Sequence, residues 1–75
     1  MKAKYPNSWY VERFCDYGNE GCEWLALFDS VGNKSYATGY INALDSFYPH
    51  PAYRLINNKG EIVKEYHART DMRLN

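Results

Sequence analysis

The side chains of this sequence that could ligate a soft metal ion, or pair a thiol nucleophile with a base, are Cys15, Cys22, His50 and His67. Structural zinc sites usually hold their ligands in close pairs, with about two to five residues between the two members. All the gaps here are wider, so the spacing argues against zinc. We expect no metal and no cofactor, and we interpret the two cysteines as small apolar side chains on neighbouring strands.

Catalytic chemistry finds little support in the same residues. A Cys–His dyad needs a loop or a helix start that activates the thiol, and neither is evident beside the cysteines. Asp45 and His50 are close in sequence, but Asp45 is expected on the polar face of a helix. A chain of 75 residues also has little material for a substrate cleft. We therefore expect that the protein is not an enzyme.

Aromatic side chains are more abundant than so small a core can hide. The chain has eight Tyr, three Phe and two Trp. A domain of this size buries only about 60% of the surface that its unfolded chain exposes, so some rings must lie at the surface. Exposed Tyr and Trp often anchor protein partners. The excess indicates a small interaction module.

The charges cancel overall but are unevenly distributed. Nine basic and nine acidic residues argue against a duplex-binding protein, which needs a surplus of Lys and Arg. Between Ser8 and Asp29 the only base is Arg13, against five acids, whereas the rest of the chain has eight bases and four acids. This asymmetry favours steering of a basic partner toward the N-terminal half. The structural alternative is an ordinary solvated face.

The start of the chain and its hydropathy indicate a cytoplasmic protein. Met1 to Pro6 has no apolar signal region, and no apolar run approaches membrane-spanning length. We expect no membrane association. In a reducing compartment both cysteines are free thiols, although an oxidised pair is geometrically possible.

Periodicity and turn residues predict the elements that must position these side chains. They are a strand over Ser8 to Asp16, a strand over Cys22 to Asp29, a helix ending at about Tyr48, a strand over Ala52 to Ile56 and a strand over Glu61 to Tyr66. Turn chemistry separates the paired strands, and Gly60 suits the left-handed position of a bulged turn. Pro49 and Pro51 end the helix.

The order of these elements predicts an α+β fold, β-β-α-β-β, with two hairpins forming an antiparallel sheet and one helix packed on one face. We expect a single domain over residues 1–75, with an ordered core over about 8–67 and a frayed tail over 68–75. One face of the sheet then has no cover from within the chain.

The register of the first hairpin decides which side chains share a face. A turn centred on Gly18-Asn19 places Cys15 opposite Cys22. One face then carries Trp9, Val11, Cys15, Cys22, Trp24, Ala26 and Phe28, and the other carries Tyr10, Glu12, Phe14, Glu23, Leu25 and Leu27. A slip of one residue would re-pair the two strands.

The helix is expected to begin after a loop over Val31 to Lys34, with Asn33 or Ser35 as its cap. Apolar residues recur through it at helical spacing. The stripe consists of Tyr36, Tyr40, Leu44 and Phe47, and we assign it to the core.

The ring surplus and the uncovered face together predict a protein-binding surface on the first hairpin. Acidic side chains would steer a basic patch of the partner, and exposed rings would anchor it. The predicted partner-binding residues are Tyr10, Glu12, Asp16, Tyr17, Glu20, Glu23 and Trp24.

Two other functions remain open. A homodimer could bury the ring-rich face against its own copy in an assembly role. Alternatively, Tyr53, Arg54, Lys64 and Tyr66 could form a sheet platform that stacks single-stranded nucleic acid. The aromatic signature of RNA recognition motifs is absent and the net charge is zero, so nucleic acid ranks below a protein partner.

The C-terminal hairpin carries a resemblance. The stretch from His50 to Tyr66, HPAYRLINNKGEIVKEY, follows a helix that ends in Phe47-Tyr48-Pro49. With the preceding hairpin, this layout resembles that of small bacteriophage accessory proteins, over about Trp9 to Tyr66. It contains no catalytic residue that could be transferred.

The resemblance implies a protein made early in infection that binds a bacterial host enzyme or defence complex and blocks it by steric occlusion. Its location would then be the host bacterial cytoplasm. The near-neutral charge departs from the strongly acidic nucleic-acid mimics found among such proteins.

Overall fold

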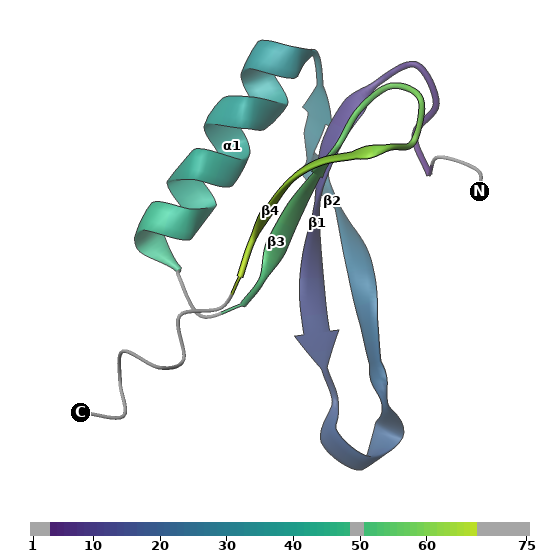
Figure 1. Cartoon of the computed structure of the whole chain (residues 1–75), viewed down its shortest axis with the longest axis vertical. Helices are drawn as coiled ribbons and strands as arrows, with labels where there is room; N and C mark the ends of the chain where they lie inside the picture. Colours follow the sequence, from purple (N-terminus) through teal and green to yellow (C-terminus); the bar gives the residue numbers. More distant parts are fainter. Residues whose placement is uncertain (1–3, 49–50, 68–75) are drawn as a thin grey trace.

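The computed structural model describes residues 4–48 and 51–67, and the predicted α+β fold is confirmed. The elements are β1 (Trp9–Asp16), the 3-10 turn η1 (Gly18–Glu20), β2 (Cys22–Gly32), α1 (Lys34–Phe47), β3 (Tyr53–Ile56) and β4 (Ile62–Tyr66). The strands form one antiparallel sheet in the order β2-β1-β3-β4. The helix lies against one side of this sheet (Figure 1). The tail predicted to fray, 68–75, lies outside the described residues.

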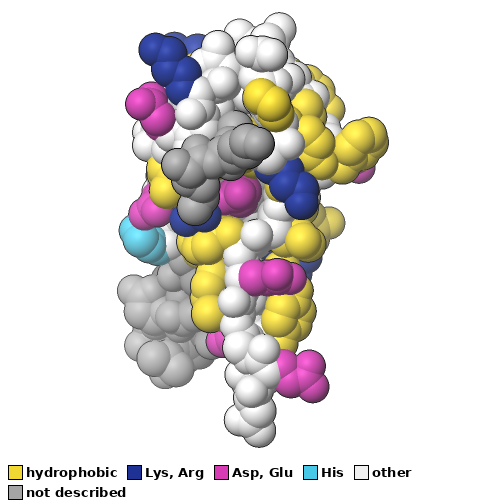
Figure 2. All heavy atoms as spheres, turned by 90° about the vertical axis from the view of Figure 1, so that its right-hand side faces the viewer, with side chains coloured by type: hydrophobic (Ala, Val, Ile, Leu, Met, Phe, Trp, Pro, Cys, Tyr) yellow, Lys and Arg dark blue, Asp and Glu magenta, His cyan; other side chains and the backbone are white. Residues whose placement is uncertain are grey.

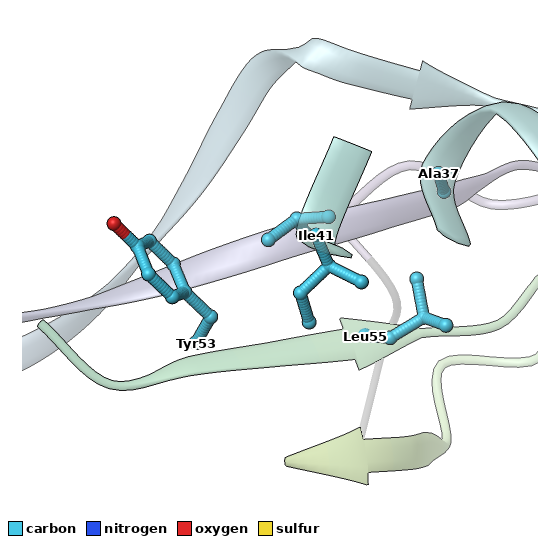
Figure 3. Close-up of a cluster of buried hydrophobic side chains, with 5 residues drawn as sticks. Ala37, Ile41, Tyr53 and Leu55 are labelled. Carbon is cyan, nitrogen blue, oxygen red and sulfur yellow. The ribbon is translucent and has the colours of Figure 1, made fainter. Parts of the chain in front are cut away.

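The core lies between α1 and the two central strands. Ala37 and Ile41 of the helix are fully buried against Val11 of β1 and against Tyr53 and Leu55 of β3. Figure 3 shows Ile41 projecting from the helix toward β3, where Leu55 lies. Because side chains alternate along a strand, the odd-numbered positions of β1 and β3 form the face that the helix covers.

The predicted core stripe of the helix is correct only at its centre. Tyr40 and Leu44 pack against the buried cluster. Tyr36 and Phe47, however, are 51% and 75% exposed. The buried positions of the helix are Ala37 and Ile41, each one residue after a position of the predicted stripe, so the ends of that stripe lie toward solvent. Asn33, one of the two expected caps, accepts a hydrogen bond from the Tyr36 N–H.

The register of the first hairpin differs from the prediction by one residue. Tyr17 to Gly21 form the turn, in which the Tyr17 N–H donates to the Gly21 carbonyl over 2.8 Å. Gly18 and Gly21 both adopt positive φ angles there, a conformation that glycine reaches at little cost. Cys15 consequently lies opposite Glu23, and Asp16 lies opposite Cys22.

This register places the two cysteines on opposite faces of the hairpin, so the predicted thiol neighbours do not meet. Both cysteines are free. Trp24 moves to the face of Phe14, its cross-strand partner, and away from the helix side.

An irregularity in β2 separates its long regular part from the helix. The ladder is continuous from Asp16↔Cys22 to Val11↔Leu27 and then shifts, so that Trp9 pairs with Gly32. The buried hydroxyl of Ser30 fills the gap. Its oxygen accepts from the Val11 N–H over 2.8 Å, and it donates to the Leu27 carbonyl over 2.6 Å. One side chain thus replaces two ladder partners that the bulge removes.

The second hairpin follows the prediction. Gly60 adopts a φ of 83°, and its N–H donates to the Asn57 carbonyl. The side-chain oxygen of Asn57 accepts from the N–H groups of Lys59 and Glu61. The turn is therefore closed by its own first residue.

Replacing Ser30 by Ala should destabilise the protein by about 1–3 kcal/mol, because the buried Val11 N–H and Leu27 carbonyl would lose their partner. Urea unfolding of Ser30→Ala measures this effect. Ser46→Ala is the matched control, since Ser46 is exposed on α1 and its loss should change stability by less than about 0.5 kcal/mol. Equal unfolding midpoints for the two variants would contradict the role given to Ser30.

Candidate protein-binding surface

The distal part of the β1–β2 hairpin projects beyond the rest of the sheet. β3 pairs with β1 only from Tyr10 to Arg13. Past this point the Phe14 N–H still donates to the Ala52 carbonyl, just before β3, and the described end of β1 at Cys15 and Asp16 pairs with β2 alone. Figure 1 shows this two-stranded end extending below the helix and the shorter strands. Its backbone and side chains are open to contact from several sides.

A compact cluster of aromatic and charged side chains forms where the hairpin leaves the sheet, on the face away from the helix. The Arg54 guanidinium lies 4.1 Å from the centre of the Trp24 ring, and its Nε donates to Glu12 over 2.6 Å. The Phe14 ring meets Trp24 edge-on at 5.3 Å. Arg54 and Glu12 are only 22% and 15% exposed, so solvent screens this ion pair less than a surface pair.

The prediction that Tyr10 is exposed is wrong. Its side chain is 3% exposed, because the N-terminal segment covers it. The Tyr5 ring packs edge-on against it at 5.2 Å, and the Lys4 N–H donates to its hydroxyl. Tyr10 therefore stabilises the fold and is not accessible to a partner.

The turn at the hairpin end carries the other predicted site residues on the surface. Asp16 is exposed and caps the turn, because its carboxylate accepts from the Gly18 N–H over 2.9 Å. Glu20 and Glu23 are also exposed. The hydroxyl of Tyr17 donates to the Glu23 carboxylate over 2.9 Å. This hydrogen bond is the main reason why the pKa of Tyr17 rises from 10.0 to about 12.

The most exposed ring of the hairpin, Phe28, is not among the residues predicted to bind a partner. Phe28 begins the β2 irregularity and is 74% exposed. The hydroxyl of Tyr36 donates to the carbonyl of the next residue, Asp29, over 2.7 Å. The only sequence signal is the pair Asp29-Ser30, which interrupts an otherwise apolar strand. In the view of Figure 2, hydrophobic side chains gather along the projecting hairpin, with acidic side chains beside them.

The alternative nucleic-acid platform is not assembled. Tyr53 is 2% exposed and lies under the helix, whereas Arg54 points to the opposite face. Tyr66 packs against the same core, and its hydroxyl donates to Asn42 of α1. The four proposed residues thus do not share one accessible face.

Within the described residues, no three His, Cys, Asp or Glu side chains gather into a group that could hold a metal ion. His50, one of the candidate ligands, lies outside the described ranges 4–48 and 51–67. No described helix is long and apolar enough to cross a bilayer.

Comparisons of the chain with protein-family models, with curated proteins and with solved structures found no match.

Replacing Arg54 by Lys should destabilise the protein by about 1 kcal/mol. The charge is kept, but the planar stack on Trp24 and the Nε donor to Glu12 are lost. Urea unfolding tests this, with Arg13→Lys as the control, because Arg13 is exposed on the neighbouring strand. If both variants unfold at the same urea concentration, the stack contributes nothing.

Tyr17 should ionise at higher pH than an ordinary tyrosine. Its pKa in the folded protein is raised above the unfolded value. The hydrogen bond of the protonated hydroxyl to Glu23 therefore stabilises the folded state fully below about pH 10, and this contribution is lost as pH rises toward 12. Carbon NMR of the Tyr17 ring across this range measures the pKa. Glu23→Gln should lower it toward 10.0, and an unchanged titration in that variant would contradict the assigned cause.

Proposed function

We propose that the protein is a non-enzymatic protein-binding module, encoded by a bacteriophage, that blocks a bacterial host or defence protein by steric occlusion. The contact surface is the projecting β1–β2 hairpin. It acts in the bacterial cytoplasm and needs no cofactor. The resemblance of the sequence layout to small phage accessory proteins supports the biological setting, and the hairpin supports the mode of action.

The observation that carries this proposal is the exposure of two large rings at the two ends of the β1–β2 ladder: Tyr17 lies in the projecting turn, and Phe28 follows the last regular pair, Val11↔Leu27, beside the body of the sheet. Tyr17 and Phe28 are 51% and 74% exposed. Because folding leaves much of both rings exposed, the free energy of removing them from water is still available on binding a partner. Tyr17 is also held in place by Glu23, which reduces the side-chain entropy that binding would cost.

The charges of the hairpin favour a basic partner surface. Asp16, Glu20 and Glu23 are exposed around its end, and the neighbouring Glu12 is already neutralised by Arg54. An acidic end of this kind raises the rate of encounter with a basic patch. The rings then supply most of the affinity. An interface of standard size requires about 800 Å² from each partner, a size that the hairpin and the adjoining sheet face can offer.

The first test is capture of the target from bacterial lysate on tagged protein, followed by titration of the purified pair. Phe28→Ala and Tyr17→Ala should each weaken the binding about tenfold or more, as expected for anchoring rings. Phe47→Ala is the matched control, because Phe47 is as exposed as Phe28 but lies at the end of α1. Its binding should equal that of the wild type.

Two outcomes would refute the hairpin as the interface. One is unchanged affinity in both hairpin variants. The other is a loss of affinity that Phe47→Ala shares, which would place the contact on the helix. Sedimentation at micromolar concentration gives a separate check, because a stable homodimer that buries the rings would favour self-assembly instead.

A further inference from the structure

The two outer strands of the sheet differ in how they are protected against pairing with another chain. β4 is short, carries Lys64 and Glu65, and has an irregular register with β3 between Leu55 and Ile56. Charges, short length and bulges are the usual devices that prevent a strand from joining the edge. Over Cys22 to Leu27, β2 has no bulge and its register with β1 is continuous, and the one charged residue of this segment is Glu23.

The exposed backbone groups of this edge can be assigned. The Phe14 N–H donates to the Ala52 carbonyl on the β3 side, so Phe14 does not exchange backbone hydrogen bonds with its β2 partner Trp24. Trp24 therefore directs its own N–H and carbonyl away from β1, and Ala26 does the same two residues further on. Within the described residues, no strand lies on that side of β2.

The charges of β2 decide between a second copy and a different partner. Its charged residues are Glu23 and Asp29, near the two ends of the regular segment, and it contains no Lys or Arg. Antiparallel pairing of two copies would bring the acidic turn of one beside Asp29 of the other. Such like-charge contacts oppose self-association, whereas a chain carrying Lys or Arg would be attracted along the same edge.

We propose that the β2 edge over Cys22 to Leu27 binds an extended Lys- or Arg-bearing segment of the target protein, which joins the sheet as an additional strand beside β2. The backbone groups at Trp24 and Ala26 hold the segment, and Glu23 and Asp29 pair with its basic side chains. Phe28 lies at the end of the edge and contacts its apolar residues. This inference rests on the proposed protein-binding function and defines the chemistry of the partner.

The probe is a short peptide of alternating Lys and Val, titrated into the labelled full chain and followed by amide NMR. Changes in amide chemical shift should concentrate on Cys22 to Leu27, and the affinity for the peptide should fall as salt is added. The same peptide with Glu in place of Lys should not bind. A peptide N-methylated along one edge, which cannot donate backbone hydrogen bonds to β2, should bind about tenfold more weakly or worse.

A protein variant gives an independent readout. Ala26→Pro removes an outward N–H without removing a hydrogen bond to β1, and proline is tolerated on an edge strand. Its amide spectrum shows whether the fold is kept, and the Lys–Val peptide should then bind about tenfold more weakly. Should Ala26→Pro fail to fold, the N-methylated peptide decides the question with the unaltered protein.

Several results would overturn strand addition at β2: no shift changes with the Lys–Val peptide, changes that concentrate on β4, or equal binding of the N-methylated peptide. The captured target separates this failure from failure of the proposed function. In one outcome, the target binds folded Ala26→Pro as tightly as the wild type while its affinity for Tyr17→Ala and Phe28→Ala falls. In that case the hairpin is the interface and strand addition is wrong. If all three variants bind it equally, both proposals are wrong.

Discussion

The hydroxyl of Ser30 is the contact on which the arrangement of sheet and helix depends. It accepts from the Val11 N–H and donates to the Leu27 carbonyl at the point where the β1–β2 ladder breaks. β2 can therefore contain additional residues that have no partner in β1. The chain then reaches Gly32, where an added Cβ would lie 2.7 Å from the Tyr36 ring. A side chain there would force the Tyr36 ring to shift. The bulge and this glycine together set the position at which the helix begins.

The placement of the helix in turn accounts for the uneven burial of the sheet. Ala37 and Ile41 cover Val11, Tyr53 and Leu55, whereas the distal hairpin receives no helix above it. On the other face, Tyr5 covers Tyr10, and the stack of Arg54 on Trp24 shields the middle of the sheet. The side chain of Arg54 thus covers apolar surface that a second helix would cover in a larger domain. It can do so because a guanidinium can lie flat on a ring while it remains paired with a carboxylate.

The order of the elements could be predicted from the sequence because each depends on local signals, such as the glycine turn at Gly60 and the cap at Asn33. The register of the first hairpin could not be predicted in this way. It depends on whether a single residue or a pair of residues lies at the centre of the turn. Gly18 and Gly21 make both turns sterically possible. That one-residue difference separates the cysteines and moves Trp24 onto Arg54. Burial of Tyr10 was also beyond local reasoning, since it depends on a segment that precedes the sheet.

Phe28 is the clearest sign that the hairpin surface is more than a by-product of folding. The irregularity in β2 is held by the side chain of Ser30 and by the Tyr36 hydroxyl on the backbone of Asp29, and neither contact involves the Phe28 ring. A polar residue at that position would leave those contacts intact and would reduce the risk of aggregation. The neighbouring acids limit that risk by charge, as lysines do on other edge strands, but they leave the surface attractive to basic chains. An exposed ring beside an acidic, unblocked edge therefore fits the basic partner that we propose better than it fits selection for stability alone.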